Sequence, residues 1–376
     1  MEKGELHLSK MSSPFPYLHM RPLSFALAIV TLVAACGDGA KKPDSASAGS
    51  APATSNTQGA DLTGAGATFP YPLYLKWFEA YAAKTGVKIN YQSIGSGGGI
   101  RQLSELTVDF GATDAPMSDA ELAKAKGGPV LHIPTALGAV VITYNLPEVA
   151  QPLKLTGEVV AAIFQGQITR WNDARIAALN AGAALPAKDI LVVHRSDGSG
   201  TTYVFTDYLA AVSPAWATKP GKGKEVQWPV GLGAKGNEGV AGQVKQTPGA
   251  LGYTELVYAN QNKLSTAMIK NANGEFIAPS VASVTAAAAG ASAKLPATTD
   301  YRVSIVNAPG AGVYPISSFT WLLVYEKQRD AAKGKKITDF VRWALSDGQG
   351  MEAALDYAPL PDVMRSALVT RVGAIQ

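Results

Sequence analysis

One stretch of the chain combines charged, hydroxyl and glycine residues directly after an apolar run, and it reads His194-Arg195-Ser196-Asp197-Gly198-Ser199-Gly200-Thr201-Thr202. The apolar run predicts a strand and the pattern after the stretch predicts a helix, so the stretch is a turn at a helix start. Its glycines let the backbone approach a ligand, and Ser199 and Thr201 add hydroxyls beside the free amides of the first helical turn. Arg195 adds a permanent positive charge that Asp197 could hold in one orientation. The turn favours an anion site, although a polar loop with an N-cap and a surface ion pair fits the same residues.

Two further glycine-rich turns precede predicted helices, at residues 64–70 and 94–100. Thr68 and Phe69 lie at the start of the first of these helices, where a hydroxyl and backbone amides are free to donate. A dinucleotide-binding fingerprint is excluded, because Phe69 occupies the place of its third glycine. The second turn carries Ser96 among its glycines, and no Gly-Lys-Ser/Thr follows, which excludes a Walker motif.

Asp114 is the one carboxylate that we expect beside these donor-rich turns. Residues 108–114 predict a short strand with Asp114 at its end, and Ser118 with Glu121 predicts a capping box for the next helix. The Asp114 carboxylate either caps backbone amides or accepts a proton from a ligand.

Strand and helix patterns alternate along most of the chain, which has 376 residues and 47% hydrophobic composition. This predicts an α/β protein of about two domains with mostly parallel sheets and a ligand at the carboxyl ends of the strands. The apolar run 139–144 is consistent with a chain entering a second core, and 319–325 predicts a strand that returns to the first. The glycine-rich turn at 231–239 lacks hydroxyls, so a structural role is predicted for it.

The first residues have the parts of an export signal, with Arg21, an apolar run at 25–33 and small residues before Cys36. The apolar run is too short for a transmembrane helix. Cys36 is the only cysteine, and its place resembles that of the acylated cysteine in a bacterial lipobox, although an incidental cysteine fits as well. We therefore expect a lipoprotein signal peptide at 1–35, with Met20 as an alternative start, and a flexible tether at 36–60. The net charge of +4 is small, and no basic stripe interleaved with aromatic residues indicates nucleic-acid binding.

Taken together, these motifs closely resemble the phosphate-binding lipoproteins and periplasmic proteins of the phosphate-specific ABC transporter, the PstS family. The resemblance covers residues 63–361, and its markers are the segments 63–70, 95–99, 108–116, 195–201 and 357–361. It implies a type II periplasmic-binding-protein fold, with one lobe from residues 61–134 and 313–376, a second from 135–312, and the ligand in the cleft between them. It also implies an anion site made by Thr68, Phe69 through its amide, Ser96, Asp114, Arg195, Ser199, Gly200 through its amide, and Thr201, with Asp197 in support.

The same resemblance implies a monomeric binding protein that is not an enzyme, needs no cofactor or metal, and delivers inorganic phosphate to the permease subunits of an ABC transporter. The protein is expected on the outer side of a bacterial membrane, in the periplasm or at the cell surface, held only by its lipid.

The chemistry is coherent, because Asp114 would repel a fully ionised anion such as sulfate yet accept the proton that phosphate retains near neutral pH. Two alternatives are a phosphate-ester hydrolase with Ser199 as nucleophile and a surface adhesin on the same fold. Against the hydrolase, Ser199 lacks the G-x-S-x-G context, and the sequence has no metal-ligand spacing.

Overall fold

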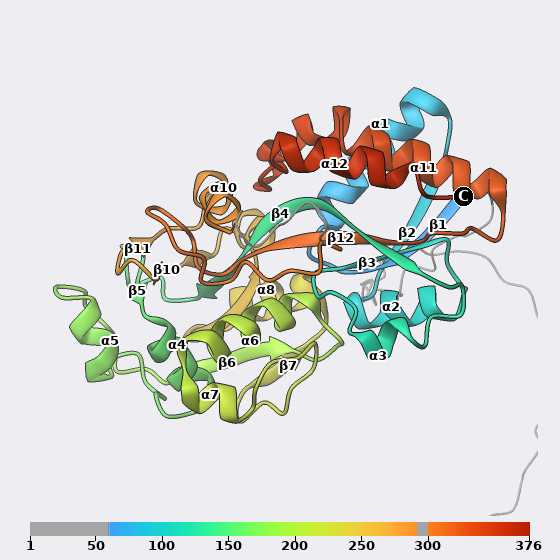
Figure 1. Ribbon diagram of the computed structural model, residues 1–376. Helices are drawn as coiled ribbons and strands as arrows, with labels where there is room; N and C mark the ends of the chain where they lie inside the picture. Colours follow the sequence, from blue (N-terminus) through green and yellow to red (C-terminus); the bar gives the residue numbers. More distant parts are fainter. Residues whose placement is uncertain (1–58, 60, 292–299) are drawn as a thin grey trace, which may run out of the picture. The chain divides into compact units, whose positions relative to one another are not determined.

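The computed structural model describes residue 59, residues 61–291 and residues 300–376 (Figure 1). The predicted leader with Met20, the lipidation site Cys36 and almost all of the predicted tether lie outside the described residues. No helix within the described ranges is both long and apolar enough to span a membrane.

The described chain forms one large sheet and one small one. The large sheet has the strand order β2-β1-β3-β12-β4-β8-β6-β7, and β9 also pairs with β4. Its strands are β1 (Leu62–Gly66), β2 (Ile89–Ser93), β3 (Phe110–Thr113), β4 (Val130–Tyr144), β6 (Leu191–Arg195), β7 (Leu232–Ala234), β8 (Ala250–Glu255), β9 (Ser265–Thr266) and β12 (Ser317–Tyr325). The small sheet joins β5 (Lys154–Leu155), β10 (Met268–Lys270) and β11 (Phe276–Ile277).

Strand β4 divides the large sheet into two lobes. Residues 130–139 of β4 pair with β12, and residues 140–144 pair with β8. The first lobe therefore contains β1, β2, β3 and β12, and the second contains β6, β7, β8 and β9. The fifteen residues of β4 are apolar enough to be buried almost throughout, because each half lies in the core of one lobe.

The sheet is mixed, whereas we expected mostly parallel pairing. Strands β1, β2 and β3 are parallel, as are β6, β7 and β8. In the centre of the sheet, β12 is antiparallel to both β3 and β4, and β4 is antiparallel to β8. The two-lobed α/β class is confirmed, and in the large sheet parallel pairing joins β1 to β2 and β3 in one lobe and β6 to β7 and β8 in the other.

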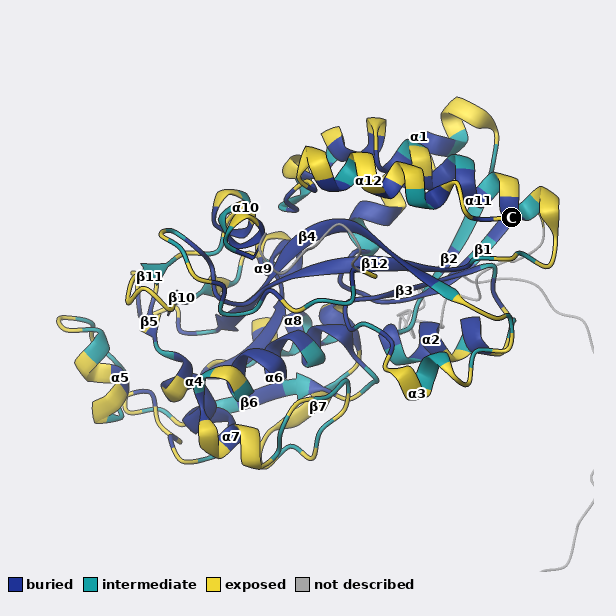
Figure 2. Cartoon of the chain, in the orientation of Figure 1, coloured by how far each residue is buried: buried dark blue, intermediate teal, exposed yellow. Residues whose placement is uncertain are grey.

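Helices cover both faces of the sheet in the first lobe. Figure 1 shows α1 (Tyr71–Thr85), α11 (Ala331–Ala344) and α12 (Asp362–Val372) on one side, and α2 (Ser96–Ser104) and α3 (Asp119–Leu122) on the other. The second lobe and the connections hold the remaining helices: α4 (Gly157–Phe164), α5 (Ala174–Leu179), α6 (Gly200–Val212), α7 (Pro214–Thr218), α8 (Gly236–Gln246), α9 (Leu256–Gln261) and α10 (Val281–Gly290). In Figure 2 the sheet strands are largely buried, while many helices expose their outer faces.

Local sequence signals explain the helices that lead to the site. Helix α1 has a proline in its first turn and ends at Gly86, whose φ of 79° favours glycine. Its buried face carries large aromatic residues, including Trp77 and Phe78. The capping box of Ser118 and Glu121 is present at the start of α3, which confirms that prediction. Two short 3₁₀ turns, η2 (Asp347–Met351) and η3 (Ala353–Leu355), follow α11.

The strand expected at 319–325 is confirmed, because β12 pairs with β3 of the first lobe. The expected lobe boundary between residues 134 and 135 lies within β4, and the boundary between 312 and 313 lies shortly before β12. These boundaries stay predictions.

Candidate functional site

Three helix starts from different parts of the chain lead into one buried region. Thr68 and Phe69 lie just before α1, Ser96 is the first residue of α2, and Ser199 is the N-cap of α6. The Ser199 hydroxyl accepts a hydrogen bond of 3.0 Å from the Thr202 amide, which fixes the first turn of α6. Because the first amides of each helix lack partners within the helix, these starts supply donors to a common site.

The predicted site residues of the two lobes lie in direct contact. A Cβ added at Gly200 would lie only 2.4 Å from Ser96 Oγ and 2.5 Å from Asp114 Oδ2. A side chain at Gly200 is therefore excluded by the first lobe. The Gly97 amide donates a 2.8 Å hydrogen bond to the Gly198 carbonyl across the same boundary. The side chains of Thr68, Ser96, Asp114, Ser199 and Thr201 are all buried, so the lobes are closed over the site.

Arg195 is a buried positive charge, and only some of its hydrogen-bond donors have partners among the described residues. Its Nε donates to Asp197 Oδ1 at 2.7 Å and its Nη2 to Asp197 Oδ2 at 2.5 Å. The Gly236 amide donates to the same carboxylate at 3.1 Å. Burial alone would raise the pKa of Asp197, but Arg195 outweighs burial and lowers it. Arg195 Nη1 is buried without a hydrogen-bond partner in the described part of the chain. A buried cationic nitrogen that no protein group satisfies is available to an anion.

Asp114 is the carboxylate of the site, and it is 1% exposed. Its Oδ1 accepts a 2.8 Å hydrogen bond from the Thr320 hydroxyl, and its amide donates to Ser96 Oγ at 3.2 Å. The side chain therefore bonds a hydroxyl of β12, whereas the cap that the sequence allowed would have bonded backbone amides. Burial raises the pKa of Asp114 to about 7, against the lowering effects of Thr320, Arg195 and Ser96.

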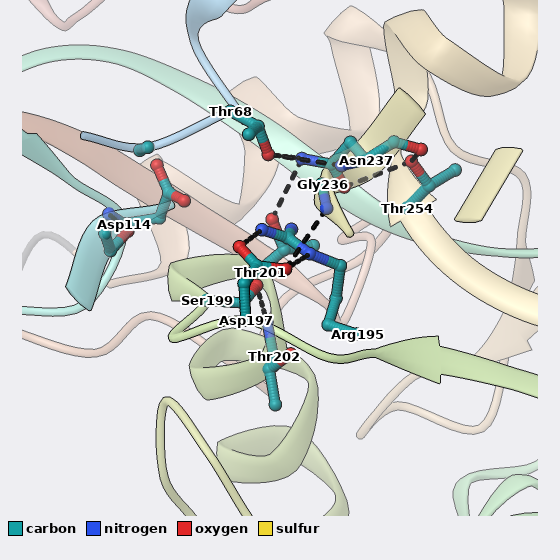
Figure 3. A network of polar contacts seen from close by, with 12 residues as sticks. Thr68, Asp114, Arg195, Asp197, Ser199, Thr201, Thr202, Gly236, Asn237 and Thr254 are labelled. Atoms are coloured by element: carbon teal, nitrogen blue, oxygen red, sulfur yellow. Dashed lines mark hydrogen bonds and ion pairs between the residues drawn. The ribbon is translucent and has the colours of Figure 1, made fainter. Parts of the chain in front are cut away.

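Figure 3 shows Thr68, Asp114, Arg195 and Thr201 around the same region, together with Asn237, which sequence reasoning missed. Asn237 is fully buried, and its side-chain amide donates to Thr68 Oγ1 at 2.8 Å and to Thr201 Oγ1 at 3.1 Å. Asn237 lies in the first turn of α8, within the glycine-rich segment 231–239 for which a structural role is predicted. The lack of hydroxyl residues in that segment did not exclude a role at the site, because the side-chain amide of Asn237 makes the contacts with the two threonines.

Two tyrosines and a cavity complete the surroundings. Tyr258 donates to the Thr68 carbonyl at 2.5 Å and Tyr357 to the Phe69 carbonyl at 2.6 Å, which fixes the backbone before α1. Tyr357 belongs to a marker segment, whereas Tyr258 and Thr320 carried no recognisable sequence signal. A cavity of about 410 Å³ lies beside Asp114 and is lined from both lobes, by Tyr203 of α6 among others.

The arrangement suits binding better than nucleophilic catalysis. Within the described residues, neither His132 nor His194 hydrogen-bonds to Ser199: His132 accepts from the Met117 amide at 3.0 Å, and His194 stacks on Trp228 with ring centroids 4.8 Å apart. In the part of the chain that the structure describes, Ser199 therefore has no histidine positioned as its base. The described ranges also contain no group of three acidic, His or Cys residues able to hold a metal.

Comparison with protein families shows the broad class to which the chain belongs. The PBP superfamily domain matches residues 51–348, so the chain belongs to this superfamily. Curated relatives then give the particular family. The chain is 46% identical to the phosphate-binding protein PstS of Xylella fastidiosa (strain Temecula1) over 311 residues, covering 82% of this chain and 84% of the relative. It is 46% identical to PstS of Pasteurella multocida over 307 residues, covering 81% and 88%. The chain is therefore a member of the PstS family.

Solved structures support the fold. A periplasmic phosphate-binding protein solved with phosphate, called PfluDING, has a TM-score of 0.64 at 23% identity, covering 82% of this chain and 93% of that chain. A phosphate-binding protein from Stenotrophomonas maltophilia has a TM-score of 0.66, also at 23% identity, with coverages of 82% and 93%. Both likenesses confirm the two-lobed architecture.

Proposed function

We propose that the chain binds inorganic phosphate in the buried site between its lobes and delivers it to the permease subunits of an ABC importer. The observation that carries the proposal is the buried Arg195 Nη1, which lacks a partner in the described chain, on a side chain that lies near Thr68, Ser199 and Thr201 (Figure 3). The names of the PstS relatives support the choice of phosphate. The proposed ligands are Thr68, Ser96, Asp114, Arg195, Ser199 and Thr201, together with Phe69 and Gly200 through their amides, and Asp197 orients Arg195.

Asp114 would make the site selective for phosphate over sulfate. Hydrogen-bond donors and a cation attract any oxyanion, so they cannot by themselves separate phosphate from sulfate. A carboxylate that accepts a proton from the ligand favours phosphate, which retains a proton near neutral pH, and repels sulfate, which does not. The Thr320 hydroxyl bonds Asp114 Oδ1 and leaves Oδ2 beside Gly200 for the ligand.

Calorimetry with phosphate and sulfate tests this function. The native protein should bind phosphate tightly and sulfate weakly or not at all. Asp114→Ala should lose phosphate affinity and gain sulfate affinity, so that the ratio of the two falls by about tenfold or more. A native protein that ignores phosphate would refute the function, whereas an unchanged ratio in a folded Asp114→Ala variant would refute only the role of Asp114.

We infer that the chain is not an enzyme, because Ser199 lacks a base among the described residues. Incubation with a generic phosphate ester should give no turnover under conditions in which phosphate binds. Turnover that is lost in Ser199→Ala would support the hydrolase instead.

Finally, we propose that Cys36 carries a lipid that holds the protein on the outer side of a bacterial membrane. The inference rests on the lipobox-like sequence before Cys36. A Cys36→Ser variant should move from the membrane fraction to the soluble fraction, and an unchanged membrane fraction would contradict lipidation.

A further inference from the structure

Asn237 connects the two lobes at the anion site. Its backbone amide and its Nδ2 both donate to Thr68 Oγ1, at 3.3 Å and 2.8 Å, and Nδ2 also donates to Thr201 Oγ1 at 3.1 Å. Thr68 belongs to the first lobe and Thr201 to helix α6 of the second. One buried side chain therefore contacts a hydroxyl from each side of the closed cleft.

The orientation of the Asn237 amide follows from the groups around it. Asn237 Oδ1 accepts from the Glu255 amide at 3.1 Å and from the Thr254 hydroxyl at 3.1 Å. A backbone amide can only donate, so the atom facing Glu255 must be the oxygen. The nitrogen then faces the two threonines and brings one proton to each.

This orientation determines what the threonine hydroxyls can do. A hydroxyl has one proton to donate and two lone pairs that accept. Thr68 Oγ1 accepts two hydrogen bonds from Asn237, and Thr201 Oγ1 accepts one. Because Asn237 Nδ2 is an amide nitrogen that only donates, it cannot accept a proton from either hydroxyl. Neither hydroxyl donates to a group within the described ranges, so both protons are available to an anion between the lobes.

We propose that Asn237 is a positioning residue that holds the Thr68 and Thr201 hydroxyls as donors toward the bound anion. The proposal rests on the phosphate-binding function proposed above and deepens it. Asn237 makes the site selective for an acceptor-rich ligand, because both lone pairs of the Thr68 hydroxyl are bonded to Asn237 and this hydroxyl can therefore only donate to the ligand. It also ties both lobes to the same side chain, so orientation of the hydroxyls is completed only when the cleft is closed.

Two variants separate this role from general support of the fold. Asn237→Ala removes the orienting donor. Thr254→Val is the matched control, since it removes a buried hydrogen bond to the same amide but leaves Glu255 to hold Oδ1 and leaves both bonds from Nδ2 in place. Phosphate affinity should fall by at least about tenfold in Asn237→Ala and change by less than about twofold in Thr254→Val. Thermal unfolding of the phosphate-free proteins should show a loss of stability in both.

Affinity losses that simply follow the losses of thermal stability in the two variants would overturn the proposal. Neutron diffraction from the native phosphate complex gives a second test that needs no variant to fold, because it locates hydrogens directly. The deuterons of both hydroxyls should point at phosphate, and a hydroxyl deuteron pointing at Asn237 would overturn the orientation. A native protein that binds no phosphate in the same calorimeter would instead reject the underlying function, so the two failures are distinguishable.

Discussion

In the proposed site, Arg195 attracts the anion and Asp114 determines which anion is bound. The guanidinium of Arg195 is held on two of its nitrogens by Asp197, which leaves Nη1 for an anion. The buried carboxylate of Asp114 repels a fully ionised anion. A ligand is therefore favoured if it carries a proton that it can donate to Asp114 in a hydrogen bond. An anion site that contains a carboxylate is thus more selective than one made of donors alone.

The raised pKa of Asp114 predicts a pH dependence of stability for the phosphate-free protein in its closed form, in which this carboxyl is buried. Burial raises this pKa from 3.8 to about 7, so the folded state holds the proton more tightly than the unfolded state. The contribution to stability is therefore complete below about pH 4 and is lost as the pH rises toward about 7, by at most about 1.4 kcal/mol per pH unit.

Urea unfolding of the native protein and of Asp114→Asn, at pH values from about 5 to about 7.5, checks this dependence. The neutral amide keeps a partner for Thr320 and does not titrate, so the difference in free energy of unfolding between the two proteins should change with pH. Parallel profiles would show that Asp114 has an ordinary pKa.

At the scale of elements, strand-to-helix turns carry most of the site, and these could be predicted. The turns before α1, α2 and α6 each join glycines to a hydroxyl residue at a helix start, which is a local signal. Asn237 could not be predicted in this way, because its partner Thr68 lies 169 residues earlier in the chain. Its turn has no local feature that distinguishes a ligand-orienting amide from a structural one.

The same limit applies to the sheet. The apolar runs of β4 and β12 could be predicted as strands, since burial on both faces leaves a continuous apolar pattern. Their antiparallel pairing with β8 and β3 depends on residues more than a hundred positions away, as for Val140 and Glu255. The partner exchange within β4, which separates the lobes, therefore leaves no trace in the sequence of β4 itself.

One ion pair between elements of different lobes predicts a slower release of ligand. Lys224 of the second lobe lies 2.8 Å from Glu121 of α3, and the two side chains are 21% and 26% exposed. The Lys224 carbonyl also accepts a 2.9 Å hydrogen bond from the Ser199 amide, so this residue connects the anion turn with the opposite lobe.

Glu121→Gln tests the ion pair while keeping an acceptor for the capping box of α3. A partly exposed pair is worth up to about 1 kcal/mol, so phosphate should dissociate up to about fivefold faster. Lys76→Met is the control, because it breaks an exposed pair within α1 that does not connect the lobes. Stopped-flow dissociation rates that are equal in Glu121→Gln and the native protein would contradict a role in holding the cleft closed.

At the scale of the whole described chain, the buried site requires the lobes to separate before a ligand can enter. Ser96 and Ser199 are 0% exposed, and a Cβ on Gly200 would collide with Asp114 across the cleft. The main connection between the lobes that can bend without breaking either core is β4, where pairing passes from β12 to β8 between residues 139 and 140. Such a crossing suits a hinge motion about two nearly rigid lobes.

We therefore expect the protein to exchange between open and closed forms, with phosphate shifting the equilibrium toward the closed form. The contacts that join the lobes in the closed form include the bond from Gly97 to Gly198 and the contacts of Asn237 with Thr68, and an anion would add further bonds from both lobes. A ligand that bonds both lobes shifts the equilibrium toward the closed form by its differential affinity. Small-angle scattering should show a smaller radius of gyration when phosphate is added, and Arg195→Ala at the same phosphate concentration should keep the larger value. A native scattering profile that stays unchanged while calorimetry shows saturated binding would mean that phosphate enters without separation of the lobes.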